Sequence, residues 1–186
     1  CVYVGEMARF VVDACEDATV TTSGANKPGC ALRFAFGNGM PRDGTWRDFE
    51  RHLGVGRVVE FYGSTEGNVN LFNNMGKVGA MGLMPRALAQ TIYPMMIARL
   101  AEDDPDDFEA LGASRGVPRL ARGPDGKCVW CDVGEVGELL GKIDPRDPSR
   151  RFDGYADDAA TRAKLARDVR REGDAYFRSG DLVSMD

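Results

Sequence analysis

The chain has 186 residues, of which 43% are hydrophobic and 28% charged, with a formal net charge of −5 at pH 7. This length allows one substantial hydrophobic core or two small ones. The acidic balance gives no electrostatic reason to expect nucleic acid as a partner, and no apolar run reaches the roughly 18 residues of a membrane-spanning helix.

The first predicted element is an amphipathic helix over residues 3–15, where apolar residues recur at helical spacing. After a polar, turn-rich loop, ALRFAF (31–36) alternates in the manner of a strand and stops at Gly37-Asn38-Gly39. Asp43 can cap a helix over 43–53 that ends at Gly54. RVVEF (57–61) predicts a second strand, which stops at Tyr62-Gly63.

These elements predict a strand–helix–strand unit. Such a crossover is nearly always right-handed and makes its two strands parallel. Both strands then end at the same edge of the sheet, and open α/β sheets bind ligands at that carboxyl edge. We therefore expect residues 37–39 and the YGSTEG segment, 62–67, to lie side by side there.

The second half of the chain predicts a β-rich, barrel-like subdomain. TIYPMMIARLA and EVGELLGKI have strand character, and a Pro-Asp-Gly turn lies between them. Residues 157–171 carry acids at their start and arginines at their end, which favours a helix. Aromatic residues then lead into a Ser-Gly-Asp turn. The expected fold is α/β, with a nucleotide-binding portion over 1–80 and the β-rich subdomain over 81–186.

The YGSTEG segment has the chemistry of a nucleotide site. Its glycines permit close approach of a ligand, Thr65 can donate to a phosphate oxygen, Glu66 can hold Mg²⁺ and Tyr62 can stack on a base. The alternative is a strand-to-helix turn that Ser64 or Thr65 caps.

Two further stretches are ambiguous. TSGANKPG (22–29) has the residue types of a phosphate loop but lacks the required spacing, so a surface loop is favoured. Asp181 can accept hydrogen bonds from the paired hydroxyls of a sugar, or it can close an Asx-turn.

The five cysteines are an odd number in a long chain, which favours reduced thiols and an intracellular setting. Cys128 and Cys131 could form a redox or zinc site, but no second cysteine pair accompanies them, and two thiols near a hairpin are favoured. His52, the single histidine, is expected on the surface of the 43–53 helix.

The order of the motifs narrows the interpretation. GNGMPRDGTW, EFYGSTEGN, GEVGELL, RRFDGY and YFRSGDL resemble, in this order, segments of adenylate-forming acyl-CoA synthetases. VYVGEMARF and DPSRRFDGYADDAATRAKLA resemble the fatty acid transport protein and very-long-chain acyl-CoA synthetase family in particular. The resemblance covers nearly all of the chain except the loop near 16–30 and the region 102–116.

This resemblance implies a nucleotide site lined by Gly37, Asn38, Gly39, Tyr62, Gly63, Ser64, Thr65 and Asp181. It implies that residues 37–39 line the adenine pocket, that Tyr62 packs on adenine and that Asp181 holds the ribose hydroxyls. Thr65 and Glu66 would be catalytic, with Thr65 at the α-phosphate and Glu66 coordinating Mg²⁺.

The implied activity is ATP-dependent ligation of a long- or very-long-chain fatty acid to coenzyme A through an acyl-adenylate. The alternative is a non-catalytic protein of the same fold that binds or transports fatty acid. Family members imply an intracellular, membrane-associated location at the endoplasmic reticulum, peroxisome or plasma membrane. The chain starts at Cys1 and lacks both the upstream phosphate loop and the C-terminal lysine domain of such enzymes, so we expect an inactive internal part of a longer synthetase.

Overall fold

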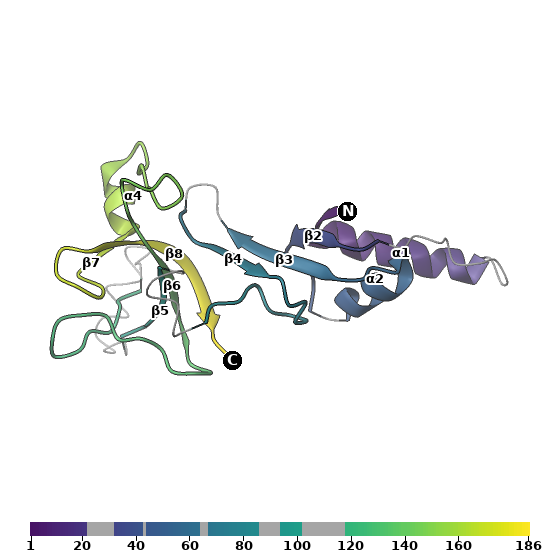
Figure 1. Cartoon of the computed structure of the whole chain (residues 1–186), viewed down its shortest axis with the longest axis horizontal. Coiled ribbons are helices and arrows are strands. Elements are labelled where there is room, and N and C mark those ends of the chain that lie inside the picture. Colours follow the sequence, from purple (N-terminus) through teal and green to yellow (C-terminus); the bar gives the residue numbers. More distant parts are fainter. Residues whose placement is uncertain (22–31, 43, 64–66, 86–93, 102–117) are drawn as a thin grey trace, which may run out of the picture. The chain divides into compact units, whose positions relative to one another are not determined.

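The computed structural model describes residues 1–21, 32–42, 44–63, 67–85, 94–101 and 118–186. They divide into two compact units, unit 1 with Cys1–Tyr62 and Asn70–Met84, and unit 2 with Gly63–Val69 and Pro85–Asp186. The described strands form two four-stranded sheets, β1 to β4 and β5 to β8 (Figure 1). TSGANKPG, the ambiguous phosphate-loop stretch, lies outside the described residues.

The sheet of unit 1 has the order β1-β2-β3-β4. Its strands are β1 (Val2–Val4), β2 (Ala35–Asn38), β3 (Val58–Gly63) and β4 (Asn70–Asn73). β1 pairs with β2, and β2 with β3, in parallel (Figure 1). The predicted strand–helix–strand unit is confirmed, because α2 (Thr45–Leu53) connects the parallel strands β2 and β3.

The helices α1 (Gly5–Thr21) and α2 pack with the strands to form the core of unit 1. That core contains Tyr3, Ala8, Val12, Ala35, Met40, Trp46, Phe49, Val55 and Val58. α2 ends at Gly54 in a left-handed conformation, as predicted, while Gly44 stands at its N-cap without a side-chain bond. The expected cap, Asp43, lies outside the described residues.

The predicted start of the first helix is wrong. Val2–Val4 is a strand, and the helix begins only at Gly5 and runs to Thr21. Valine and tyrosine suit a pleated surface, and β2 offers this segment a parallel partner that the local spacing does not reveal. Pairing with a distant strand therefore overrides the helical pattern.

Alternation along the strands separates the two faces of this sheet. Tyr3, Ala35 and Val58 face the helix-covered core. The alternate positions carry aromatic rings: Phe36 stacks on Phe61 with ring centroids 4.9 Å apart, and on Phe72 at 6.4 Å. Successive side chains in a strand point to opposite faces, so the aromatic residues lie on the face away from the core.

Unit 2 contains an antiparallel sheet in the order β5-β6-β8-β7. Its strands are β5 (Met95–Arg99), β6 (Val136–Lys142), β7 (Leu165–Arg167) and β8 (Ala175–Ser184). The β-rich prediction is confirmed, but the described strands form an open sheet and no closed barrel, because β5 and β7 are its edges. One core cluster of this unit contains Met96, Ala98, Cys128, Leu140, Ala166, Val169 and Tyr176.

The predicted helix over 157–171 is mostly wrong. Only α4 (Asp158–Ala163) is helical, with the Asp157 carboxylate accepting a hydrogen bond from the Ala159 N–H at 2.8 Å. The chain then turns into β7, which pairs with β8. The reason is tertiary: Leu165–Arg167 pairs with residues 175–177 of β8, and this pairing uses backbone groups that a continued helix would need for its own hydrogen bonds.

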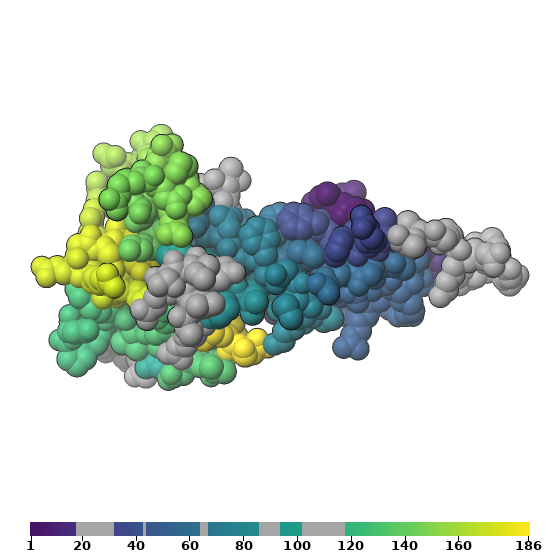
Figure 2. Space-filling view, viewed as in Figure 1, coloured from purple at the N-terminus to yellow at the C-terminus, as the bar shows by residue number. Residues whose placement is uncertain are grey.

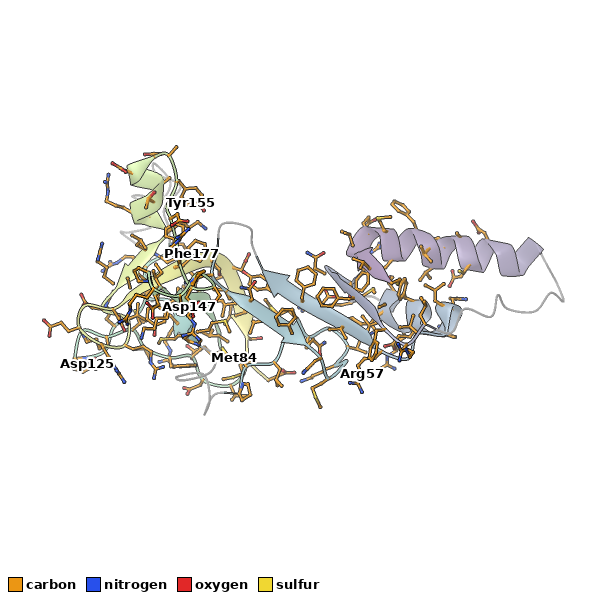
Figure 3. The ribbon with its side chains drawn as sticks, turned by 45° about the horizontal axis from the view of Figure 1, so that its top comes forward. Arg57, Met84, Asp125, Asp147, Tyr155 and Phe177 are labelled. Carbon is orange, nitrogen blue, oxygen red and sulfur yellow. The ribbon has the colours of Figure 1, made fainter. Side chains whose placement is uncertain are left out.

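The segment leading into α4 rests on aromatic contacts. Phe152 packs against Tyr155 and against Phe177 of β8, with ring centroids 5.9 and 5.0 Å apart. Tyr155 and Phe177 lie next to each other in Figure 3, and the green segment around α4 covers part of the yellow C-terminal strand in Figure 2.

Among the described helices, none has both the length and the apolar character needed to cross a membrane.

Candidate functional site

The carboxyl ends of β2 and β3 form one edge of the sheet in unit 1. The strands are parallel, with Gly37 opposite Glu60, so both run toward this edge. Gly37 and Asn38 are the last residues of β2, Gly39 follows, and Tyr62 and Gly63 end β3. The next three predicted site residues, Ser64, Thr65 and Glu66, lie outside the described residues. The structure thus brings together the described ends of the two motifs.

The two glycines of the GNG segment are required for different reasons, Gly39 by its backbone conformation and Gly37 by close packing. Gly39 has φ 72°, a left-handed conformation that glycine adopts without strain. A Cβ on Gly37 would overlap the backbone oxygen of Tyr3 in β1, and a Cβ on Gly5 would overlap the carbonyl oxygen of Gly39. The turn after β2 is therefore packed directly against the start of α1.

A buried carboxylate, Glu60, lies behind this turn. It is 6% exposed and accepts hydrogen bonds from the Tyr3 hydroxyl and, at 2.9 Å, from the Met40 N–H. Burial, together with the adjacent Glu60 carboxylate, raises the pKa of the Tyr3 hydroxyl well above its ordinary value. The sequence analysis did not single out either residue. The available signal was an acid at an inward-facing position of an apolar strand, two residues after Val58.

Asp181 lies in unit 2, within a strand and not in the predicted turn. β8 continues through Ser179, Gly180 and Asp181, although Gly180 has φ 83° and the pairing register shifts opposite this region, between Glu138 and Leu140. The Asp181 N–H donates to the Ser179 hydroxyl oxygen at 3.1 Å, and Asp181 is exposed. The predicted Ser-Gly-Asp turn is instead a bulge within β8: Arg178 pairs with Leu140 and Leu182 with Glu138, so residues 179–181 all lie opposite Leu139 of β6.

A buried ion pair fixes the backbone next to Asp181. The Glu138 carboxylate is 1% exposed and accepts hydrogen bonds from Arg178 Nε at 3.1 and 3.0 Å. The Gly180 N–H donates to the same carboxylate at 3.2 Å. Sequence reasoning missed this contact, whose only signal was an acid inside the apolar run GELL.

Asn68, just after YGSTEG, anchors the chain within unit 2. Its side-chain amide donates to the Lys142 carbonyl at 2.9 Å and to the Arg150 carbonyl at 3.1 Å. A side chain on Gly141 would overlap the Asn68 amide oxygen, so this approach depends on glycine. The residues that follow the predicted phosphate segment are therefore tied to the end of β6.

Curated relatives identify the family. The chain is 36% identical over 184 residues to long-chain fatty acid transport protein 1 of Bos taurus, covering 99% of this chain and 25% of the relative. It is 34% identical over 188 residues to long-chain fatty acid transport protein 5 of Homo sapiens, covering 99% and 23%. The chain belongs to the long-chain fatty acid transport protein family. It spans about a quarter of the length of these relatives, and no family model matches it.

Solved structures show the fold of this family member. An artificially fused adenylation–PCP di-domain containing NpsA of Klebsiella oxytoca matches with a TM-score of 0.52 at 14% identity, covering 100% of this chain and 26% of that one. VinN matches with a TM-score of 0.52 at 18% identity, covering 100% and 36%. At this identity the likeness establishes the fold alone, which is that of part of an adenylation domain. The predicted fold class and family are confirmed.

The remaining candidates in this family member have little chemical support. Cys128 and Cys131 are buried, and burial raises the pKa of the Cys128 thiol, which disfavours the reactive thiolate. Within the described part of the chain, no three His, Cys, Asp or Glu residues are grouped to hold a metal. His52 is half-buried, with Nε2 3.7 Å from the Glu16 carboxylate, and does not lie on an open surface as predicted.

Proposed function

We propose that this chain is the nucleotide-binding part of an ATP-dependent ligase that joins a long- or very-long-chain fatty acid to coenzyme A. The parallel pairing of β2 and β3 carries the proposal, because it brings the GNG segment and the start of YGSTEG to one sheet edge. Family membership and the adenylation-domain fold support it. A fold neighbour, the NpsA N-terminal subdomain, is described in complex with 3-hydroxyanthranilyl-AMSN, at a TM-score of 0.51.

In this proposal the adenine lies against the backbone of residues 37–39 and the ring of Tyr62. The glycines leave the backbone polar groups accessible to a flat base, and an aromatic ring stacks on its face. The exposed Asp181 carboxylate accepts hydrogen bonds from the ribose hydroxyls, and Thr65 donates to the α-phosphate.

The reaction consists of two displacements. The fatty-acid carboxylate attacks the α-phosphorus and pyrophosphate leaves, which gives the acyl-adenylate. The coenzyme A thiol then attacks the acyl carbonyl and AMP leaves, which gives the thioester. The chain contributes alignment of the two anions and donors oriented toward the α-phosphate. We assign Mg²⁺ to Glu66, which lies outside the described residues; an ion held there would neutralise phosphate charge.

The test uses a longer protein that contains this chain. Acyl-CoA formation should require ATP and coenzyme A, and Glu66→Ala should abolish it. Asp181→Asn should raise the KM for ATP roughly 10- to 100-fold, since hydrogen bonds to charged groups contribute about 1.5–3 kcal/mol. Asp153→Asn, the same change at an exposed residue paired with Arg151, is the matched control and should have no effect. Full activity in the Glu66 variant would remove that residue from the mechanism.

The second candidate is a fatty-acid transport or binding protein without catalysis. The relatives' own name, long-chain fatty acid transport protein, favours it. Release of pyrophosphate on addition of fatty acid and ATP separates the two functions: the ligase releases it, and the binding protein takes up fatty acid without it. For either function we infer membrane association through parts of the protein outside this chain.

A further inference from the structure

We propose that Glu60 is a positioning residue for the nucleotide, because it fixes the peptide group that ends the Gly37-Asn38-Gly39 segment. This inference rests on the proposed function. Glu60 lies in β3, two residues before Tyr62, with its side chain turned to the core of unit 1. It cannot touch the base from there, so it acts through the backbone it holds.

The Glu60 carboxylate connects three elements of unit 1. Its two oxygens accept from the Tyr3 hydroxyl in β1 and from the Met40 N–H in the turn after β2. A buried carboxylate is costly unless hydrogen bonds replace its water, and here both donors come from outside its own strand. A hydrophobic residue would fill this inward position, like Val58 two residues earlier, without the desolvation cost. The acid therefore serves the geometry of the turn more than the stability of the core.

The Gly39–Met40 peptide group is fixed at both ends. Its N–H, from Met40, donates to Glu60 Oε1 at 2.9 Å. Its carbonyl, from Gly39, is packed so closely against Gly5 that a Cβ there would overlap it. With both ends of the peptide plane held, Asn38 and Gly39 present one backbone conformation before the nucleotide arrives. Such preorganisation lowers the ordering cost of binding.

The experiment compares variants of a longer protein that contains this chain. Glu60→Ala removes the acceptor of the Met40 N–H and should raise the KM for ATP about tenfold, with the KM for coenzyme A unchanged. Glu60→Gln keeps an oxygen for Met40 and an amide for Tyr3, and should restore the wild-type value. Val58→Ala, on the same strand and face, is the matched control: it should lower stability and leave the KM for ATP unchanged.

Hydrogen exchange provides a readout that does not depend on activity. The Met40 amide should exchange faster in Glu60→Ala than in Val58→Ala, because only the first variant frees it. If Glu60→Ala does not fold, Tyr3→Phe decides, since it removes one of the two donors to Glu60 and keeps the ring. It should raise the KM for ATP roughly two- to fivefold.

The outcomes separate the two proposals. If the wild-type protein binds no ATP, the proposed function fails and the positioning role fails with it. If the wild type binds ATP, but Glu60→Ala matches Val58→Ala in its KM for ATP and in Met40 exchange, only the positioning role is overturned. An unchanged KM in Tyr3→Phe, where that variant decides, has the same meaning.

Discussion

The buried Glu138–Arg178 pair gives a sharp prediction about the stability of unit 2. Glu138→Gln keeps the size of the side chain but replaces one carboxylate oxygen with an amide that donates hydrogen bonds. In the wild type both oxygens accept from Arg178, and one also accepts from the Gly180 N–H. In the variant an amide N–H donor therefore faces the N–H donors of its partners, and the guanidinium charge of Arg178 has lost its counter-charge.

Burial sets the magnitude. The side chains of Arg178 and Glu138 are 11% and 1% exposed, so water cannot replace the lost oxygen. Removing one partner of a buried ion pair costs about 3–5 kcal/mol. In a chain of this size 1 kcal/mol shifts the melting temperature by about 2–4 °C, so we expect a fall of roughly 6–20 °C.

Urea unfolding followed by tryptophan fluorescence measures the effect, since Trp130 packs against the core cluster of unit 2. Asp153→Asn makes the same chemical change at an exposed ion pair with Arg151 and should have little effect. Adding Arg178→Met to Glu138→Gln should recover much of the loss, because a neutral pair no longer buries a lone charge. Strictly additive losses, or a Glu138→Gln cost below about 1 kcal/mol, would refute the reasoning.

Variants at three other positions test the stability of unit 2. Leu140→Ala, at a fully buried side chain, should cost about 2–5 kcal/mol in urea unfolding, and a cost like that of a surface substitution would contradict the described core. Asp157→Ala removes the N-cap of α4 and should cost about 0.5–2 kcal/mol, while Asp157→Asn, which also caps, should cost less. Burial, aided by Asp174, raises the pKa of Tyr176 from 10.0 to about 12, so the folded state favours the protonated phenol. That contribution is complete below pH 10 and is lost as the pH rises toward 12, so the wild type should lose about 2–3 kcal/mol relative to Tyr176→Phe across this window, and parallel pH profiles would disprove it.

The elements that the sequence predicted well are those in which local and tertiary preferences agree. The β2–α2–β3 unit is defined by alternation, by a left-handed Gly54 at the end of the helix and by short connections. The errors occur where a distant partner decides the structure. Val2–Val4 continues the helical spacing of the residues that follow it, but it forms a strand because it pairs with β2. Leu165–Arg167 has the composition of a helix, but it forms a strand because it pairs with β8.

In the candidate site, too, the features set by local pattern were predictable and those set by distant partners were not. The strand ends that carry Asn38 and Tyr62 follow from periodicity and the handedness of the crossover, so the sequence predicts that they share an edge. The side-chain contacts that hold the backbone near the candidate residues cannot be predicted from the sequence in this way. Tyr3 meets Glu60 across 57 positions of the chain, and Arg178 meets Glu138 across 40. A single sequence contains no signal for such a pairing beyond an acid in an apolar run.

The close approach of Gly5 to the Gly39 carbonyl has a consequence for how this region can evolve. A methyl group at position 5 must push that oxygen aside, so even alanine alters the loop although nothing at position 5 faces solvent. A mutational screen would then find position 5 as intolerant of substitution as a residue that contacts a ligand. A homologue that gains a side chain at position 5 must therefore reshape the backbone at position 39.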